Sequence, residues 1–74
     1  MKIILTDHAK ERMTVRKITE KMVKEAIIYP ESDGVGYQNR FLVFKSFSGG
    51  VIKVVFNKEK DCHIIISTIW ENIK

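Results

Sequence analysis

The hydrophobic positions follow a helical pattern in the first third of the chain. After a short β-prone segment at 2–5, two stretches have helical spacing, one from Asp7 to Arg16 and one that begins after Thr19. Thr19 is a suitable N-cap for the second stretch, and Pro30 ends it because the residue before a proline avoids helical angles. The pattern therefore predicts two helices, the second of which is clearly amphipathic.

The rest of the chain has the composition of strands. Three segments are rich in β-branched and aromatic residues, namely Gly36 to Phe47, Val51 to Asn57 and Cys62 to Trp70. Ser48–Gly50 supplies glycines for a tight hairpin turn, and Asn57–Asp61 is a slightly longer polar turn. Because these links are short, we expect three sequential, antiparallel strands.

These elements predict an α+β fold. The chain is long enough for one hydrophobic core and too short for two, so we expect a single domain, 1–74. Neither the helices nor the strands can bury their apolar faces alone. We therefore expect two N-terminal helices packed on one side of a three- to four-stranded antiparallel sheet, with 2–5 as the candidate fourth strand.

Alternation along the strands gathers polar side chains on one face of the predicted sheet. We expect the helices to cover the purely apolar face. The open face then mixes aromatic and aliphatic side chains with Lys45, Lys53, His63 and Ser67. Such a face can bind RNA through phosphate contacts and base stacking, and it can equally bind a protein partner.

The net charge of +4 comes from one short window of the sequence. Residues 10–24 hold six basic and two acidic side chains, which account for the whole excess. Such a patch can attract a polyanion or an acidic protein. A solvated helical surface would have the same composition.

The number of cysteines and the length of the apolar runs indicate the cellular compartment of the protein. Cys62 is the single cysteine and cannot form an internal disulfide, which argues for a reducing compartment. The apolar run after Met1 ends at Thr6, too short for a signal peptide, and the run at 64–66 is far shorter than a membrane span. We therefore expect a soluble, cytoplasmic protein that does not associate with membranes.

The strongest chemical signal is a cationic stripe on the first predicted helix. His8, Arg12 and Arg16 are four residues apart, so a helix stacks them along one side. Ala9 and Met13 fall beside this stripe, which places the imidazole and both guanidiniums at the border of the buried face. Cationic groups in that position suggest a surface or cleft that binds an anion.

The same block carries a family resemblance. The order His8-Ala9-x-x-Arg12-Met13-x-x-Arg16-x-Ile18, a lone arginine that opens a strand, and the segments 52–55 and 66–69 resemble the small prokaryotic Domain of Unknown Function 4258 family over nearly the whole chain. That family is distantly similar to RelE-type toxins and to the barnase/EndoU/colicin/RelE-like fold. The resemblance implies an endoribonuclease of the toxin–antitoxin kind, with an acidic antitoxin as its partner.

Metal-independent RNA cleavage would need a base for the ribose 2′-hydroxyl, an acid for the leaving oxygen and fixed cations for the charge on phosphorus. An unperturbed histidine titrates near neutrality, so either histidine could act as base or acid, and arginines could clamp the phosphate. The candidate catalytic residues are His8, Arg12, Arg16 and Arg40. The candidate RNA-binding residues are Lys45, Lys53 and His63.

Other roles for these residues remain open. No cofactor is expected, and two distant histidines with one cysteine predict no metal site. Many RelE-like toxins carry a tyrosine or histidine near the C-terminus, whereas this chain has Trp70 there. The arginines of the stripe could instead form internal ion pairs, and His8 could fix a packing angle. A noncatalytic module that binds RNA or a protein is the alternative function.

Overall fold

The two helices begin at threonine caps. In the computed structural model, which describes residues 2–71, Thr6 Oγ1 accepts a hydrogen bond from a first-turn N–H and caps α1 (Asp7–Arg16). Thr19 Oγ1 does the same for α2 (Glu20–Ile28). Each cap satisfies a backbone donor that the first helical turn leaves free. The predicted positions of both helices are confirmed.

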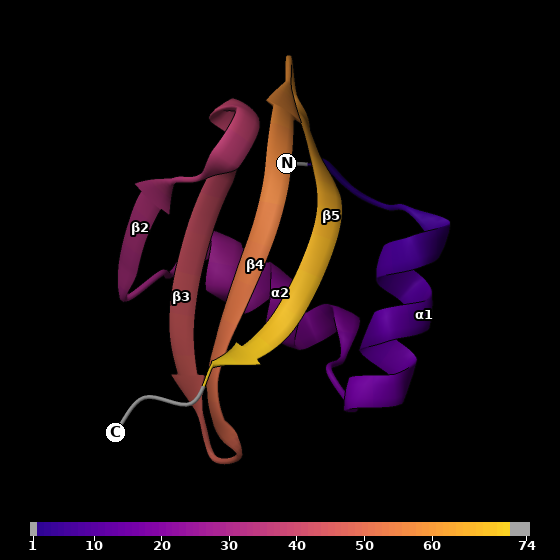
Figure 1. Cartoon of the computed structure of the whole chain (residues 1–74), viewed down its shortest axis with the longest axis vertical. Coiled ribbons are helices and arrows are strands. Elements are labelled where there is room, and N and C mark those ends of the chain that lie inside the picture. Colours follow the sequence, from indigo (N-terminus) through magenta and orange to yellow (C-terminus); the bar gives the residue numbers. More distant parts are fainter. Residues whose placement is uncertain (1, 72–74) are drawn as a thin grey trace.

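The described strands form one mixed sheet. They are β1 (Lys2–Leu5), β2 (Ser32–Val35), β3 (Phe41–Phe47), β4 (Gly50–Glu59) and β5 (Cys62–Glu71), in the spatial order β1-β5-β4-β3-β2. The pairs from β2 to β5 are antiparallel, whereas β1 runs parallel to β5 (Figure 1). The predicted α+β class is confirmed, but the prediction of three to four antiparallel strands is wrong: the sheet has five strands and one parallel pair.

The strand β2 lies where the sequence indicates a loop. All four of its residues are exposed, so it has no hydrophobic alternation that a pattern could reveal. It pairs with β3 because the chain reverses through the 3₁₀ turn Tyr37–Asn39, in which Gln38 and Asn39 adopt left-handed φ values of 58° and 59°. The strand predicted from Gly36 therefore begins only at Phe41.

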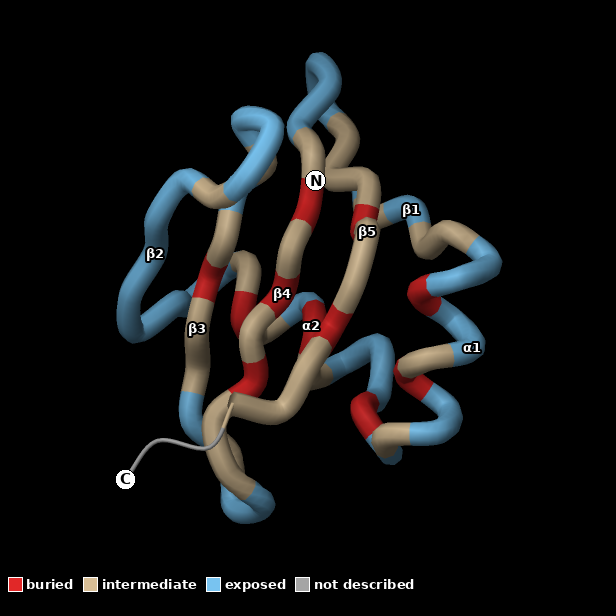
Figure 2. The backbone as a smooth tube through the Cα atoms, in the orientation of Figure 1, coloured by how far each residue is buried: buried red, intermediate tan, exposed pale blue. Residues whose placement is uncertain are grey.

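The core lies between the sheet and the helices. The helix α2 crosses behind the sheet, while α1 lies beside β5 (Figure 1). Buried positions occur in both helices and in the strands β3, β4 and β5 (Figure 2). The buried apolar residues are Ala9, Met13, Ile18, Val23, Ala26, Val43, Ile52, Val54, Phe56 and Ile65.

A β-bulge decides which side chains of β5 face the helices. Val55 pairs with Ser67 but Phe56 pairs with Ile65, so Ile66 has no residue opposite it. The extra residue reverses the alternation along β5. Consequently Thr68 lies on the same, helix-covered side as Ile65, although strict alternation would separate them.

The same pairing corrects the predicted open face. Lys45 pairs with the buried Ile52, which places Lys45 on the helix-covered side, whereas Lys53 pairs with Phe44 on the opposite side. The His63 ring contacts Phe56, which is also on the covered side. The prediction that the two lysines, His63 and Ser67 share one open face is therefore wrong: only Lys53 and Ser67 lie there.

Helix α1 is fastened to the edge of β5 by side chains that reach the backbone. Thr6 Oγ1 donates to the carbonyl of Ile65 at 2.9 Å, and Arg16 Nη1 donates to that of Thr68 at 2.6 Å. Trp70 Nε1 donates in return to the carbonyl of Arg16 at 2.7 Å. The short β1 pairs only with the first residues of β5, so these bonds satisfy carbonyls farther along that edge.

Thr68 provides a test of this packing. Its side chain is fully buried, and its hydroxyl has no hydrogen-bond partner within the described residues. An unsatisfied buried hydroxyl is costly, whereas valine has nearly the same shape. We expect Thr68→Val to raise the free energy of unfolding by about 1 kcal/mol in urea denaturation. A loss of stability instead would mean that the hydroxyl has a partner in solution.

Candidate functional site

The cationic stripe of α1 lies at the edge of the sheet. Arg12 and Arg16 are half-buried, as predicted for the border of the buried face, whereas His8 is exposed and departs from that prediction. Arg16 is held by the Thr68 carbonyl, so its guanidinium joins α1 to β5 rather than pairing with a carboxylate. The ion pair found within residues 2–71 involves neither arginine. Within the same residues, neither His8 nor Arg12 has an ion pair or a side-chain hydrogen bond.

Arg40 does not join this stripe. It immediately precedes β3, whereas α1 lies beyond β5, with β4 between the two strands (Figure 1). Because neighbouring strands are about 4.8 Å apart, two strand spacings and a helix separate Arg40 from α1. The four predicted catalytic residues therefore do not form one compact pocket.

The two candidate lysines are also apart. Lys45 lies on the helix-covered side of β3, as its pairing with Ile52 requires. Lys53 lies on the open side, where its Nζ is 2.9 Å from Glu71 Oε1. This ion pair is partly exposed, so it contributes little to stability, but it balances the charge that Lys53 would offer to a phosphate.

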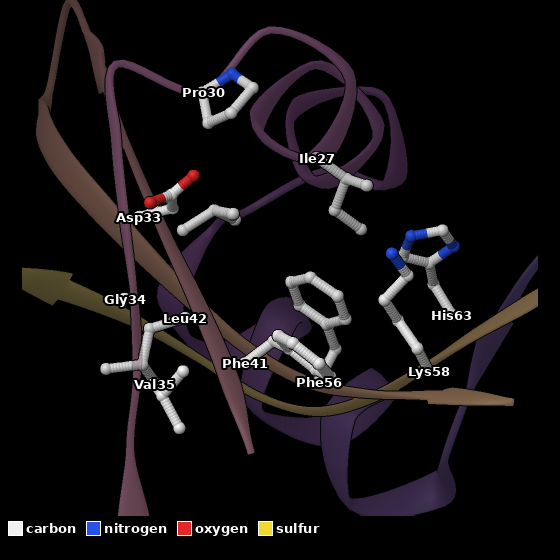
Figure 3. Close-up of a pocket in the computed structure, with 11 residues that line it drawn as sticks. Ile27, Pro30, Asp33, Gly34, Val35, Phe41, Leu42, Phe56, Lys58 and His63 are labelled. Atoms are coloured by element: carbon white, nitrogen blue, oxygen red, sulfur yellow. The ribbon is translucent and has the colours of Figure 1, made fainter. Parts of the chain in front are cut away.

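His63 is the candidate residue that lines a cavity. The cavity has a volume of about 420 Å³ and lies on the helix-covered side, between the C-terminal end of α2 and the ends of β2, β3 and β4 (Figure 3). Its walls are largely apolar, and three ionisable side chains border it. These are His63 and Lys58, side by side at one end, and Asp33 at the other (Figure 3).

Aromatic rings support the imidazole. The Phe56 ring centroid is 5.1 Å from that of His63 and 5.8 Å from that of Phe41, with which it stacks at 23°. The Lys58 ammonium lies 5.7 Å from the centre of the Phe41 ring. Both phenylalanines therefore form a continuous apolar wall between the two ends of the cavity.

The surroundings of His63 favour the neutral form of its imidazole ring. Its Nδ1 is buried without a hydrogen-bond partner among the described residues, which leaves Nε2 as the nitrogen that a ligand can reach. Burial lowers the pKa of His63 below its ordinary value of 6.5, and the nearby Lys58 ammonium lowers it further. At neutral pH the ring can thus offer a lone pair rather than a positive charge.

The comparisons with known proteins identify the family. The model of the domain of unknown function DUF4258 matches residues 5–71. The chain belongs to the DUF4258 family. No curated protein and no solved structure matched this sequence. The DUF4258 match includes α1 with its histidine and arginines, and it also includes every residue of the His63 cavity.

Sequence reasoning missed most of the residues that surround His63 in this DUF4258 chain. The segment Asn57–Asp61 has a polar composition and was predicted as a turn, but β4 continues to Glu59 and pairs Lys58 with His63. A shorter turn at 60–61 would have predicted this pair, because hairpin register follows from turn length. No sequence pattern marked Asp33 as a residue of this cavity, because the strand that positions it has no alternation of apolar and polar residues.

Two further properties of the DUF4258 chain concern residues 2–71 only. No cluster of three or more His, Cys, Asp or Glu side chains there could hold a metal ion. Neither helix has the length and apolar character needed to cross a membrane.

The lowered pKa of His63 predicts a pH dependence of stability. The unfolded chain takes up a proton near pH 6.5, and the folded protein takes it up only at lower pH. The free energy of unfolding is therefore expected to fall as pH decreases from 6.5 through the folded-state pKa. Urea denaturation at several pH values measures this slope. His63→Gln should reduce this slope, and an unchanged slope in the variant would contradict the assignment.

Proposed function

We propose that this DUF4258 protein binds single-stranded RNA at the His63 cavity and cleaves it without a metal ion. The observation that carries the proposal is a half-buried imidazole, whose pKa burial lowers, beside a lysine ammonium in a cavity with an aromatic wall. The cavity volume of about 420 Å³ falls in the usual range for small-ligand sites. A single nucleotide is a suitable occupant, because aromatic rings and cations bind its base and phosphate.

His63 and Lys58, the two ionisable groups at one end of the cavity, have different roles in the proposed reaction. His63 Nε2 accepts the proton of the ribose 2′-hydroxyl, and the 2′-oxygen then attacks the adjacent phosphorus. Lys58 stabilises the negative charge that grows on the phosphate oxygens. The bond from phosphorus to the 5′-oxygen breaks, and solvent supplies the proton to that oxygen. The products are a 2′,3′-cyclic phosphate and a 5′-hydroxyl.

In this proposal, the basic side chains of the two helices attract RNA over a long range. Residues 10–24 hold six basic and two acidic side chains and lie on α1, α2 and the turn between them. We propose that this surface attracts the RNA backbone and that His8 and Arg12 contact phosphates outside the cavity. Arg16 has the structural role of fastening α1 to β5.

The family resemblance adds a biological setting to the proposal. A RelE-like endoribonuclease would act as a cytoplasmic toxin and would be restrained by an acidic antitoxin protein. The net charge of +4 supports an acidic partner, because complementary charge accelerates association.

One observation favours the alternative, a noncatalytic module that binds a protein. The open face of the sheet has half-buried apolar side chains that no described element covers, including Phe44, Val51, Val55 and Ile69. An apolar surface of this kind is typical of a partner-binding face. This alternative predicts that RNA remains intact in the presence of the protein.

The direct test is incubation of the purified protein with a labelled single-stranded RNA of mixed sequence in EDTA. We expect fragments that end in 2′,3′-cyclic phosphate, identified by mass spectrometry, and no cleavage of DNA of the same sequence, which lacks the 2′-hydroxyl. Intact RNA, together with no RNA binding at low salt, would contradict the proposal.

A further inference from the structure

The end of the cavity opposite His63 has a carboxylate that the proposed chemistry does not use. Asp33 pairs with the buried Val43 across β2 and β3, so its side chain is on the helix-covered side of the sheet. It lines the cavity together with Ile27, near the end of α2, and Pro30, which follows that helix (Figure 3). Residues 2–71 offer it neither an ion pair nor a side-chain hydrogen bond.

We infer that this end of the cavity is a nucleobase subsite that selects guanine, with Asp33 as the specificity residue and Phe41 as the stacking surface. The inference rests on the proposed function, because it names the base that RNA would place in the same cavity.

The choice of guanine follows from the chemistry of the carboxylate. An ionised carboxylate only accepts hydrogen bonds, and its two oxygens can accept two parallel ones. On its Watson–Crick edge guanine has adjacent donors, N1–H and the 2-amino group. Adenine and cytosine each place an acceptor nitrogen next to their amino group, and uracil has one N–H between two carbonyls. Guanine is therefore the standard RNA base that satisfies both oxygens of Asp33.

Phe41 supplies the stacking surface. Its side chain is 39% exposed although it lies in the cavity wall, and one face of the ring is stacked on Phe56. A planar base can cover the exposed part of the ring, as bases do on aromatic side chains in RNA-binding proteins. Lys58, whose side chain is exposed and extends over the Phe41 ring, can then turn to the phosphate. A base at Asp33 and a phosphate at Lys58 lie at opposite ends of the cavity, as the two ends of a nucleotide require.

Binding of mononucleotides to the full chain tests the inference without relying on cleavage. Calorimetric titration in EDTA would compare GMP with IMP, which lacks only the 2-amino group, and with AMP. We expect GMP to bind on the order of tenfold more tightly than either, because a two-bond contact to a base edge has about this discrimination. Asp33→Asn should remove the preference, since an amide cannot accept both hydrogen bonds. Asp61→Asn, a matched change in the exposed β4–β5 turn, should leave it intact.

A second variant separates stacking from selection. Phe41→Leu should weaken the binding of GMP, IMP and AMP by a similar factor and leave their ratios unchanged. Thermal unfolding of each variant would confirm that it is folded before binding is measured.

The outcomes distinguish the subsite from the proposed cleavage. If GMP is preferred and Asp33→Asn abolishes the preference, the subsite stands even when the protein fails to cleave RNA. If RNA is cleaved after all four nucleotides alike and GMP binds no better than IMP, the subsite is overturned. Asp33 would then be a charge that only protects an edge strand from pairing with other chains.

Discussion

His63→Gln is expected to lower kcat/KM for RNA cleavage by about 10²- to 10⁴-fold, the usual contribution of a positioned general base. Glutamine keeps a polar group of similar length in the cavity but cannot accept the proton of the 2′-hydroxyl at neutral pH. The measurement is the initial rate of cleavage of a fluorescent RNA in EDTA, with circular dichroism to show that the variant is folded.

His8→Gln is the matched control for this prediction. His8 is exposed on α1 and does not line the cavity. Its loss removes only the proposed phosphate contact outside the cavity, so it should lower kcat/KM far less than His63→Gln does. The opposite result, a large loss with His8→Gln and a small one with His63→Gln, would move the base to the stripe on α1. It would contradict the assignment of the site to the cavity.

Ile52→Ala is expected to have the largest effect on stability. Ile52 is fully buried near the start of β4, the middle strand of the sheet, and faces the helices, so truncation leaves a cavity in the core. Such changes reduce the free energy of unfolding by about 2–5 kcal/mol, a large fraction of the total for a domain of this size. Urea denaturation followed by far-ultraviolet circular dichroism would give the difference directly.

The neighbouring Val51 provides the control for the two faces of the sheet. It is half-buried and points to the open side, so Val51→Ala should cost clearly less than Ile52→Ala. Equal losses would mean that both faces are covered in solution, for example by a second copy of the chain.

Local signals in the sequence predicted the helices well. A cap such as Thr19 acts within one turn, and Pro30 restricts the residue next to it, so a short window contains the whole cause. The β3–β4 hairpin could be predicted for the same reason, whereas the β4–β5 turn is shorter than the predicted Asn57–Asp61. The strand β1 lies at the predicted segment 2–5, but its parallel pairing with β5 depends on a partner far along the chain. The strand β2 consists of exposed residues without a pattern, so local reasoning missed it.

The sheet faces illustrate how one residue can reverse a prediction. Strict alternation assigns Ile66 and Thr68 to one side and Ile65 to the other, but the bulge at Ile66 shifts Thr68 to the side of Ile65. A bulge inserts one residue without changing composition or hydrophobicity, so the sequence pattern does not reveal it. Lys45 was misplaced for a different reason, because a basic residue on the covered side breaks the expected division into apolar and polar faces.

Single residues of the candidate site were identified from the sequence, but which residues lie together was not. His63 was identified from its chemistry, but its neighbours Lys58, Asp33 and Phe56 depend on strand register and on the end of α2. The helical spacing predicted the border position of Arg12 and Arg16 correctly, but not that of His8, which is exposed at the start of α1. The separation of the cationic stripe from Arg40 could be established only from the order of the strands.

The most direct test of the central claim is an NMR titration of the protein with a short single-stranded RNA whose 2′-methoxy groups prevent cleavage. The account predicts that the ring signals of His63 and Phe41 shift strongly on binding and that the His8 ring shifts less. Strong shifts confined to His8 and the other residues of α1, with the cavity signals unchanged, would contradict it.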